Sequence, residues 1–136
     1  LGFPPSVIAD LRTAVAKWKP QVVPNAREIT VRKFNQLRDA GATFLFGTDA
    51  GQTGNSHSQS MWQEMYTWVN ELGMDPLLVI RRATYFAAQT MGAERESGSV
   101  SEGKYADVIA VRGDPTRHIE VLRDPAIVIK RGQRYK

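Results

Sequence analysis

Phe44-Leu45-Phe46-Gly47-Thr48-Asp49-Ala50-Gly51 is the stretch of this chain that decides its fold. The residues from Thr43 to Gly47 form a short continuous apolar run, which is typical of a parallel strand covered on both faces. Asp49 follows this strand at once. A carboxylate at the carboxyl end of a buried strand can bind a metal ion or accept a proton from a metal-bound water. An Asp at such a place is also commonly a helix cap or a turn residue.

Helices are predicted on both sides of this strand. Apolar residues recur at helical spacing, and proline or glycine marks the helix ends. Asn25 and Glu28 have the spacing of a capping box, as do Ser60 and Gln63. The predicted helices cover about residues 5–18, 25–41, 60–73 and 75–92. A helix, a buried strand and further helices in succession predict the α/β class with a parallel sheet.

The pattern changes at Ser97. Short β-type runs then alternate with glycine-containing turns, in residues 98–100, 106–111 and 127–130. We therefore predict two domains: residues 1–96 with the strand and its helices, and residues 97–136 as a small β lobe.

Composition excludes several classes of protein. The 136 residues carry a net charge of +4, and the Lys and Arg residues are scattered, so no nucleic-acid partner is expected. The absence of cysteine excludes disulfides and a Cys-based zinc site. No apolar run approaches the roughly 20 residues that span a bilayer, and no signal peptide is visible, so we expect no membrane partner and a cytoplasmic location.

An ordered set of motifs resembles the amidohydrolase superfamily, in particular imidazolonepropionases and Xaa-Pro dipeptidase-type hydrolases. The resemblance runs from about residue 26 to the end. The matching motifs are Gly47-Thr48-Asp49, Gly73-Met74-Asp75-Pro76, Ala83-Thr84-Tyr85-Phe86-Ala87-Ala88 followed by Gly92, Gly98 to Asp107, Gly113-Asp114-Pro115 and Lys130 to Gly132.

This resemblance implies the C-terminal portion of a (β/α)8 TIM barrel, with the strand at Thr43 to Gly47 as strand eight, and part of a small β-sandwich lobe. It also implies a metal-dependent hydrolase that cleaves amide, cyclic amide or peptide-like C–N bonds of a small-molecule or peptide-like substrate. Asp49 would be both catalytic residue and metal ligand, in a site for one or two divalent ions, usually zinc. The superfamily's other ligands, a His-x-His pair among them, have no match in this chain, which should therefore be inactive by itself.

Other candidate residues have weaker support. His57, in the loop after Asp49, could contact substrate, although a solvated loop histidine is the simpler interpretation. His118 is the only other histidine and is expected at the surface. A catalytic role for Glu64 is not favoured. Asp107 is expected to form structural hydrogen bonds in the β lobe.

A strand with the apolar character of residues 43–47 cannot stand alone in water, because both its edges would be unpaired. The first residue is Leu rather than Met. We therefore expect that the rest of the barrel, from a missing N-terminal portion or an oligomer partner, completes the sheet. The alternative is a non-catalytic barrel relative, or a fragment that serves as an interaction or assembly module.

Overall fold

The computed structural model describes Ala9, Thr13 and residues 24–52 and 56–136. The helix predicted over residues 5–18 lies outside the described residues apart from Ala9 and Thr13, which are helical and joined by a 3.0 Å hydrogen bond from the Thr13 hydroxyl to the Ala9 carbonyl. The chain divides into two compact units, residues 1–30 and 31–136. In the part of the chain that is described, no helix is long and apolar enough to cross a bilayer.

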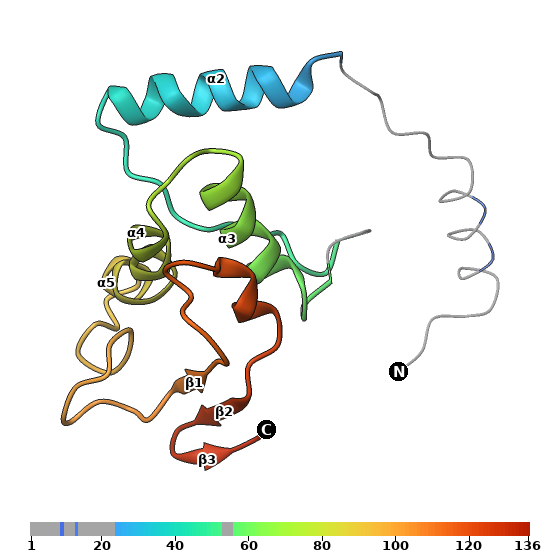
Figure 1. Cartoon of the computed structure of the whole chain (residues 1–136). Coiled ribbons are helices and arrows are strands. Elements are labelled where there is room, and N and C mark those ends of the chain that lie inside the picture. Colours follow the sequence, from blue (N-terminus) through green and yellow to red (C-terminus); the bar gives the residue numbers. More distant parts are fainter. Residues whose placement is uncertain (1–8, 10–12, 14–23, 53–55) are drawn as a thin grey trace. The chain divides into compact units, whose positions relative to one another are not determined.

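The three helices predicted after residue 24 are confirmed, with shorter bounds (Figure 1). Asp75 caps one of them, because its carboxylate accepts a 2.8 Å hydrogen bond from the Leu78 amide and Pro76 occupies the first turn. The helices are α2 (Ala26–Asp39), α3 (Ser60–Asn70), α4 (Pro76–Arg81), a π-helical turn (Arg82–Phe86) and α5 (Ala87–Thr90). The last three form one helical run over the single helix predicted for residues 75–92.

The capping box predicted at Ser60 is wrong. Gln59 is the N-cap residue of α3, and it makes no side-chain capping bond. Ser60 is the first helical residue, and its hydroxyl donates to the carbonyl of Ser56 at 2.7 Å. The spacing to Gln63 therefore carries no capping role, because Ser60 bonds backward into the preceding turn.

The apolar run predicted as a strand forms no β-ladder with any described segment. Its burial nevertheless alternates: Phe44 and Phe46 are half-buried, whereas Thr43, Leu45 and Gly47 are exposed. This period of two is that of an extended strand with one covered face. A parallel ladder needs neighbouring strands, and none of the described residues supplies one.

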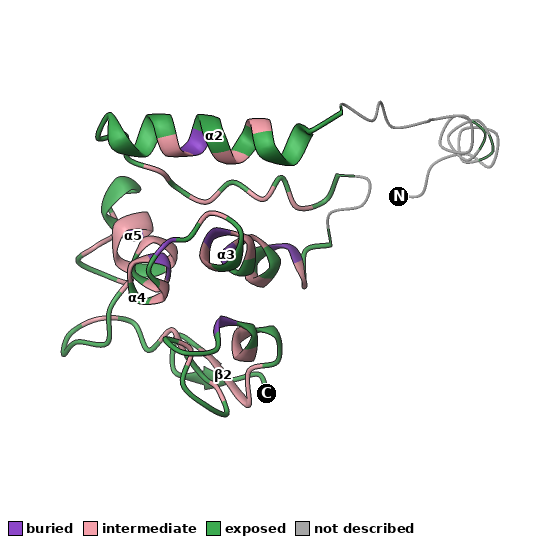
Figure 2. Ribbon diagram, turned by 45° about the horizontal axis from the view of Figure 1, so that its top comes forward, coloured by how far each residue is buried: buried purple, intermediate pink, exposed green. Residues whose placement is uncertain are grey.

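One hydrophobic core lies in the compact unit of residues 31–136. It joins the C-terminal half of α2, α3, α4 and the 3₁₀ turn at Ile119–Arg123, which packs against α3 (Figure 2). Val79 is completely buried and Ile119 is 2% exposed. The buried residues of this core are Phe34, Met65, Trp68, Met74, Val79 and Ile119. The apolar segment that contains Phe44 and Phe46 packs against this core. Helices around an extended segment, with a small antiparallel sheet elsewhere in the chain, are consistent with part of an α/β fold.

The C-terminal region contains a three-stranded antiparallel sheet, in the order β1-β2-β3. Val108 pairs with Ile129, and Lys130 pairs with Gln133. The strands are β1 (Val108–Ala110), β2 (Ile127–Lys130) and β3 (Gln133–Arg134). Two of the three predicted β-type runs thus contain strands, and the domain boundary at residue 96 stays a prediction.

The β-type run predicted at residues 98–100 is wrong, since these residues form a bend and an irregular segment. Gly98 has a φ of +84°, and a Cβ there would lie 2.6 Å from the Cβ of Ala88 and 3.0 Å from the Thr84 carbonyl oxygen. Only glycine allows the chain to cross the helical run this closely.

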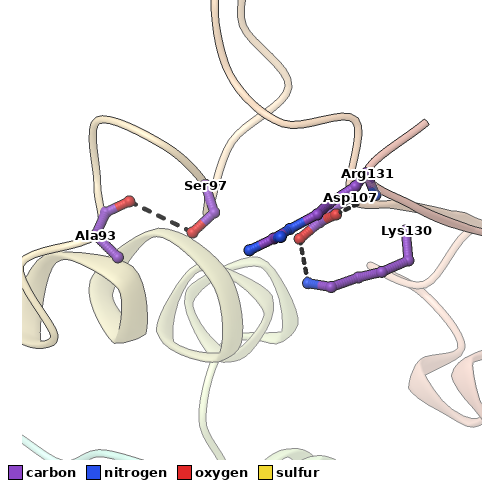
Figure 3. Close-up of polar contacts among 5 residues, drawn as sticks. All are labelled: Ala93, Ser97, Asp107, Lys130 and Arg131. Atoms are coloured by element: carbon purple, nitrogen blue, oxygen red, sulfur yellow. Dashed lines mark hydrogen bonds and ion pairs between the residues drawn. The ribbon is translucent and has the colours of Figure 1, made fainter.

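The Asp107 side chain binds the turn between β2 and β3 (Figure 3). Its carboxylate lies 2.5 Å from the Lys130 ammonium and accepts a 2.7 Å hydrogen bond from the Arg131 amide. Arg131 and Gly132 both have positive φ, as in a two-residue type I′ hairpin turn. The Arg131 guanidinium also lies 5.0 Å from the centre of the Tyr105 ring. The structural hydrogen-bonding role predicted for Asp107 is confirmed.

Replacing Asp107 with Asn should lower stability near neutral pH but not in acid. The hydrogen bond from Lys130, and then that from the Arg131 amide, lower the pKa of Asp107. Its ionised form therefore stabilises the fold above the unfolded-state pKa of about 3.9, and that contribution is lost as pH falls through the lower folded-state pKa. Urea midpoints of wild type and D107N should differ near pH 7 and converge in acid, once the pH falls below the folded-state pKa of Asp107. A difference that does not depend on pH would contradict this account.

Candidate functional site

The segment before Asp49, residues 43–47, packs against α2 and α3 through aromatic rings. The Phe44 ring lies 4.5 Å from Phe34 of α2, measured between centroids, and 6.3 Å edge-on from Trp68 of α3. Phe46 stacks on Trp68 with a centroid distance of 4.1 Å. Phe34 and Trp68 are each 7% exposed. The two helices therefore cover one face of this segment, as the helices of an α/β layer cover a strand.

The opposite face of the segment is open among the described residues. Leu45 is 42% exposed, and Asp49, which ends the segment, is also exposed. Asp49 has a left-handed backbone with a φ of +48°, and its carbonyl accepts a 3.2 Å hydrogen bond from the Gln52 amide. Asp and Asn tolerate this conformation better than most residues do. The carboxylate thus stands at the point where the extended chain turns into the loop.

Glu64 of α3 reaches the same segment. Its Oε1 accepts a 3.2 Å hydrogen bond from the Gly47 amide, 17 residues earlier. Its Oε2 is buried and has no hydrogen-bond partner among the described residues. Burial raises the pKa of the Glu64 carboxyl, and the negative charge of Asp49 raises it further, whereas hydrogen bonds from the Gly47 amide and the Trp68 side chain oppose the rise. Two carboxylates therefore interact electrostatically at the end of this segment.

A small polar cavity of about 260 Å³ adjoins Glu64. Its walls come from the end of the apolar segment and from the first two turns of α3. They are Gly47, Thr48, Ser60, Gln63, Glu64 and Thr67. All these residues are glycine or polar, so the cavity has the chemistry of a site for water or a small polar group.

Arg82, at the start of the π-helical turn, contacts the segment from a third element. Its Nη1 donates to the Phe44 carbonyl at 3.1 Å. The guanidinium lies 5.3 Å from the centre of the Phe86 ring, and the buried Nε has no partner among the described residues. Sequence reasoning gave Arg82 no role and did not favour Glu64. Neither contact has a local signal, because each joins residues far apart in the chain.

The two histidines have different surroundings. His57 is exposed, and its ring lies against Gly51, because a Cβ built on Gly51 would be 2.9 Å from Nε2. His57 therefore lies beside Gly51, which follows Asp49 by two residues. His118 is at the surface, as predicted, with its Nδ1 3.4 Å from a carboxylate oxygen of Glu120.

The described residues do not form a metal site by themselves. No group of three or more His, Asp or Glu side chains gathers in the part of the chain that the structure describes. A catalytic zinc typically takes three protein ligands. Asp49 could supply one of them, at an exposed position that other residues could approach.

The chain has clear relatives among known proteins. A model of the amidohydrolase family matches residues 7–134. Adenine deaminase from Ruegeria is 34% identical over 90 residues, which is 66% of this chain and 14% of that protein. Ochratoxinase from Aspergillus niger is 34% identical over 90 residues, covering 65% of this chain and 18% of that protein.

Solved structures agree with these relatives. A Xaa-Pro dipeptidase crystallised with methionine in its active site has 37% identity and a TM-score of 0.70, over 78% of this chain and 25% of that one. The crystal structure of Aspergillus niger ochratoxinase has 29% identity and a TM-score of 0.63, over 78% of this chain and 24% of that one. The chain thus spans about a quarter or less of the length of these relatives.

Proposed function

Because this chain belongs to the amidohydrolase family, we propose that it is the part of a metal-dependent hydrolase that supplies Asp49 to the active site. The bonds cleaved would be amide, cyclic amide or peptide-like C–N bonds. The observation that carries the proposal is the position of Asp49, at the end of an extended segment with one helix-covered face and one open face. An open face of this kind suits the interior side of a barrel strand.

In this proposal, residues 43–47 are strand eight of a (β/α)8 barrel, and its parallel neighbours come from other residues of the protein or from a partner. The exposed Leu45 supports this, since a large apolar side chain on the open face would be buried by the side chains of other strands in the barrel interior. The β-sheet of residues 108–134 would belong to a small β-sandwich lobe.

The bound metal, which we propose to be zinc, would supply an acidified water and polarise the carbonyl group. Asp49 would bind the metal with its carboxylate and hold the proton that the water loses, then release it to the leaving nitrogen. The left-handed backbone at Asp49 turns the loop away immediately after the carboxylate. His57, which lies in the same loop against Gly51, is proposed to contact substrate.

The names of the relatives suggest the substrates to test first: Xaa-Pro dipeptides, ochratoxin and adenine. We expect the natural polypeptide to hydrolyse a member of this panel, to lose turnover after dialysis against a chelator, and to regain it when Zn²⁺ is restored. Hydrolysis that survives complete removal of metal, shown by elemental analysis of the same sample, would contradict the proposal. A natural polypeptide that binds no divalent metal would favour the non-catalytic alternative.

A further inference from the structure

The backbone of the segment that ends at Asp49 is held at two points by side chains of other elements. Glu64 of α3 accepts from the Gly47 amide at 3.2 Å. Arg82, from the π-helical turn, donates to the Phe44 carbonyl at 3.1 Å. The Glu64 carboxylate thus accepts from a backbone amide, and the Arg82 guanidinium donates to a backbone carbonyl. Between them they satisfy two backbone groups in a segment that has no ladder with any described strand.

Gly47 depends on this contact more than its neighbours do. Phe44 and Phe46 are fixed by their rings, which pack on Phe34 and Trp68. Gly47 has no side chain, and a Cβ built on it would meet nothing within 4 Å. Among the contacts of the described residues, the hydrogen bond from its amide to Glu64 holds Gly47, two residues before Asp49.

Both holding groups leave a buried polar atom unpaired among the described residues, Oε2 in Glu64 and Nε in Arg82. An unpaired buried polar atom costs stability. Each of these charged groups nevertheless makes a hydrogen bond to the backbone of residues 44–47, and that bond is what joins it to the segment before Asp49.

We propose that Glu64 and Arg82 are positioning residues for Asp49, which together set the backbone of residues 44–47 and thereby the place of the Asp49 carboxylate. This inference rests on the proposed function, since it assumes that the position of Asp49 affects turnover. In this proposal neither Glu64 nor Arg82 contacts the substrate. Catalytic groups must be held closely in place, and loss of a supporting hydrogen bond typically lowers activity 10- to 100-fold.

The first test measures the geometry without any activity. Amide hydrogen exchange is followed in the natural polypeptide at residue level by mass spectrometry. In E64A, we expect exchange of the Gly47 amide to be about tenfold faster, because one charge-assisted hydrogen bond is lost. In E64Q, exchange should stay within about threefold of wild type, because the amide oxygen can still accept. The exposed turn residue Glu102, replaced by Ala, is the control and should leave Gly47 unchanged.

The second test measures the consequence for turnover. On the panel substrate that the wild type hydrolyses, E64A and R82M should lower kcat about 10- to 100-fold with little change in KM, and E64Q should recover most of the loss. Arg81→Met is the matched control for Arg82. Arg81 is exposed and lies 5.4 Å from the same Phe86 ring, but it makes no described contact with residues 43–47, so R81M should keep the wild-type kcat.

Wild-type exchange at Gly47 in E64A would overturn the proposal, as would a kcat that is unchanged in E64A and R82M. A kcat loss in E64Q as large as that in E64A, with Gly47 exchange preserved, would also overturn it, because Glu64 would then act through its charge. If D49N keeps full activity, the proposed function fails, and the exchange test still reports whether Glu64 holds Gly47. The two failures are therefore distinguishable.

Discussion

Replacement of Asp49 by Asn is expected to lower kcat by at least about a hundredfold, because positioned proton transfer contributes roughly 10²- to 10⁴-fold to catalysis. Asn is the informative substitution at this position. The backbone of Asp49 is left-handed, with a φ of +48°. Asn adopts this conformation about as readily as Asp, so D49N removes the charge without adding backbone strain. An alanine at this position would change both at once.

The measurement is steady-state hydrolysis by the natural polypeptide, together with its metal content. D49N should lose turnover and bind the metal less tightly, while its unfolding midpoint stays near that of wild type. Asp39→Asn is the matched control: Asp39 is exposed at the end of α2, its carboxylate pairs with Arg38 at 3.1 Å, and it makes no described contact with residues 43–49. Full activity in D49N would exclude Asp49 as the proton carrier.

Replacement of Trp68 by Ala is expected to lower the free energy of unfolding by about 3–5 kcal/mol, the usual cost of removing a buried Trp. Trp68 is 7% exposed and lies at the centre of the aromatic cluster. Its ring stacks on Phe46 at 4.1 Å and meets Phe44 edge-on at 6.3 Å. The substitution therefore leaves a cavity in the core and also removes the surface on which the segment before Asp49 rests.

Urea denaturation of the natural polypeptide measures this cost. Trp68→Phe keeps a ring for Phe46 to stack on and should lose much less stability than W68A. Met91→Ala is the control, since Met91 is 82% exposed and its loss should change stability by no more than about 0.5 kcal/mol. If the unfolding free energy of W68A stayed within about 1 kcal/mol of wild type, the aromatic cluster would not be what supports the segment before Asp49.

Much of the local structure could be predicted from the sequence. Helical spacing, together with the signals at Asp75-Pro76, Gly73 and Gly92, locates α3 and the run from α4 to α5 to within a few residues. These predictions succeed because spacing and capping act between residues that are close in the chain. The turn at Arg131 and Gly132 is local in part: Gly132 suits its positive φ, whereas the positive φ of Arg131 has no signal in the residue type.

The sequence was less informative where a feature depends on distant residues. The apolar run at residues 43–47 has the composition of a strand, yet a strand also needs a partner, and the described residues offer none. Leu37 has the helical spacing of a core residue of α2, yet it is 52% exposed, whereas Phe34 is buried against Phe44 and Trp68. A periodic pattern shows which face is apolar, and packing alone decides how much of that face is covered.

The candidate site likewise has one part that the sequence shows and another part that depends on tertiary packing. The sequence by itself determined that a carboxylate, Asp49, follows an apolar extended segment, because these residues are adjacent in the chain. Only the tertiary structure decided that Glu64 holds the Gly47 amide and that Arg82 holds the Phe44 carbonyl, across 17 and 38 residues. The physical reason is that a side chain's donor or acceptor finds its backbone partner through the packing of whole elements, and no local spacing records that packing.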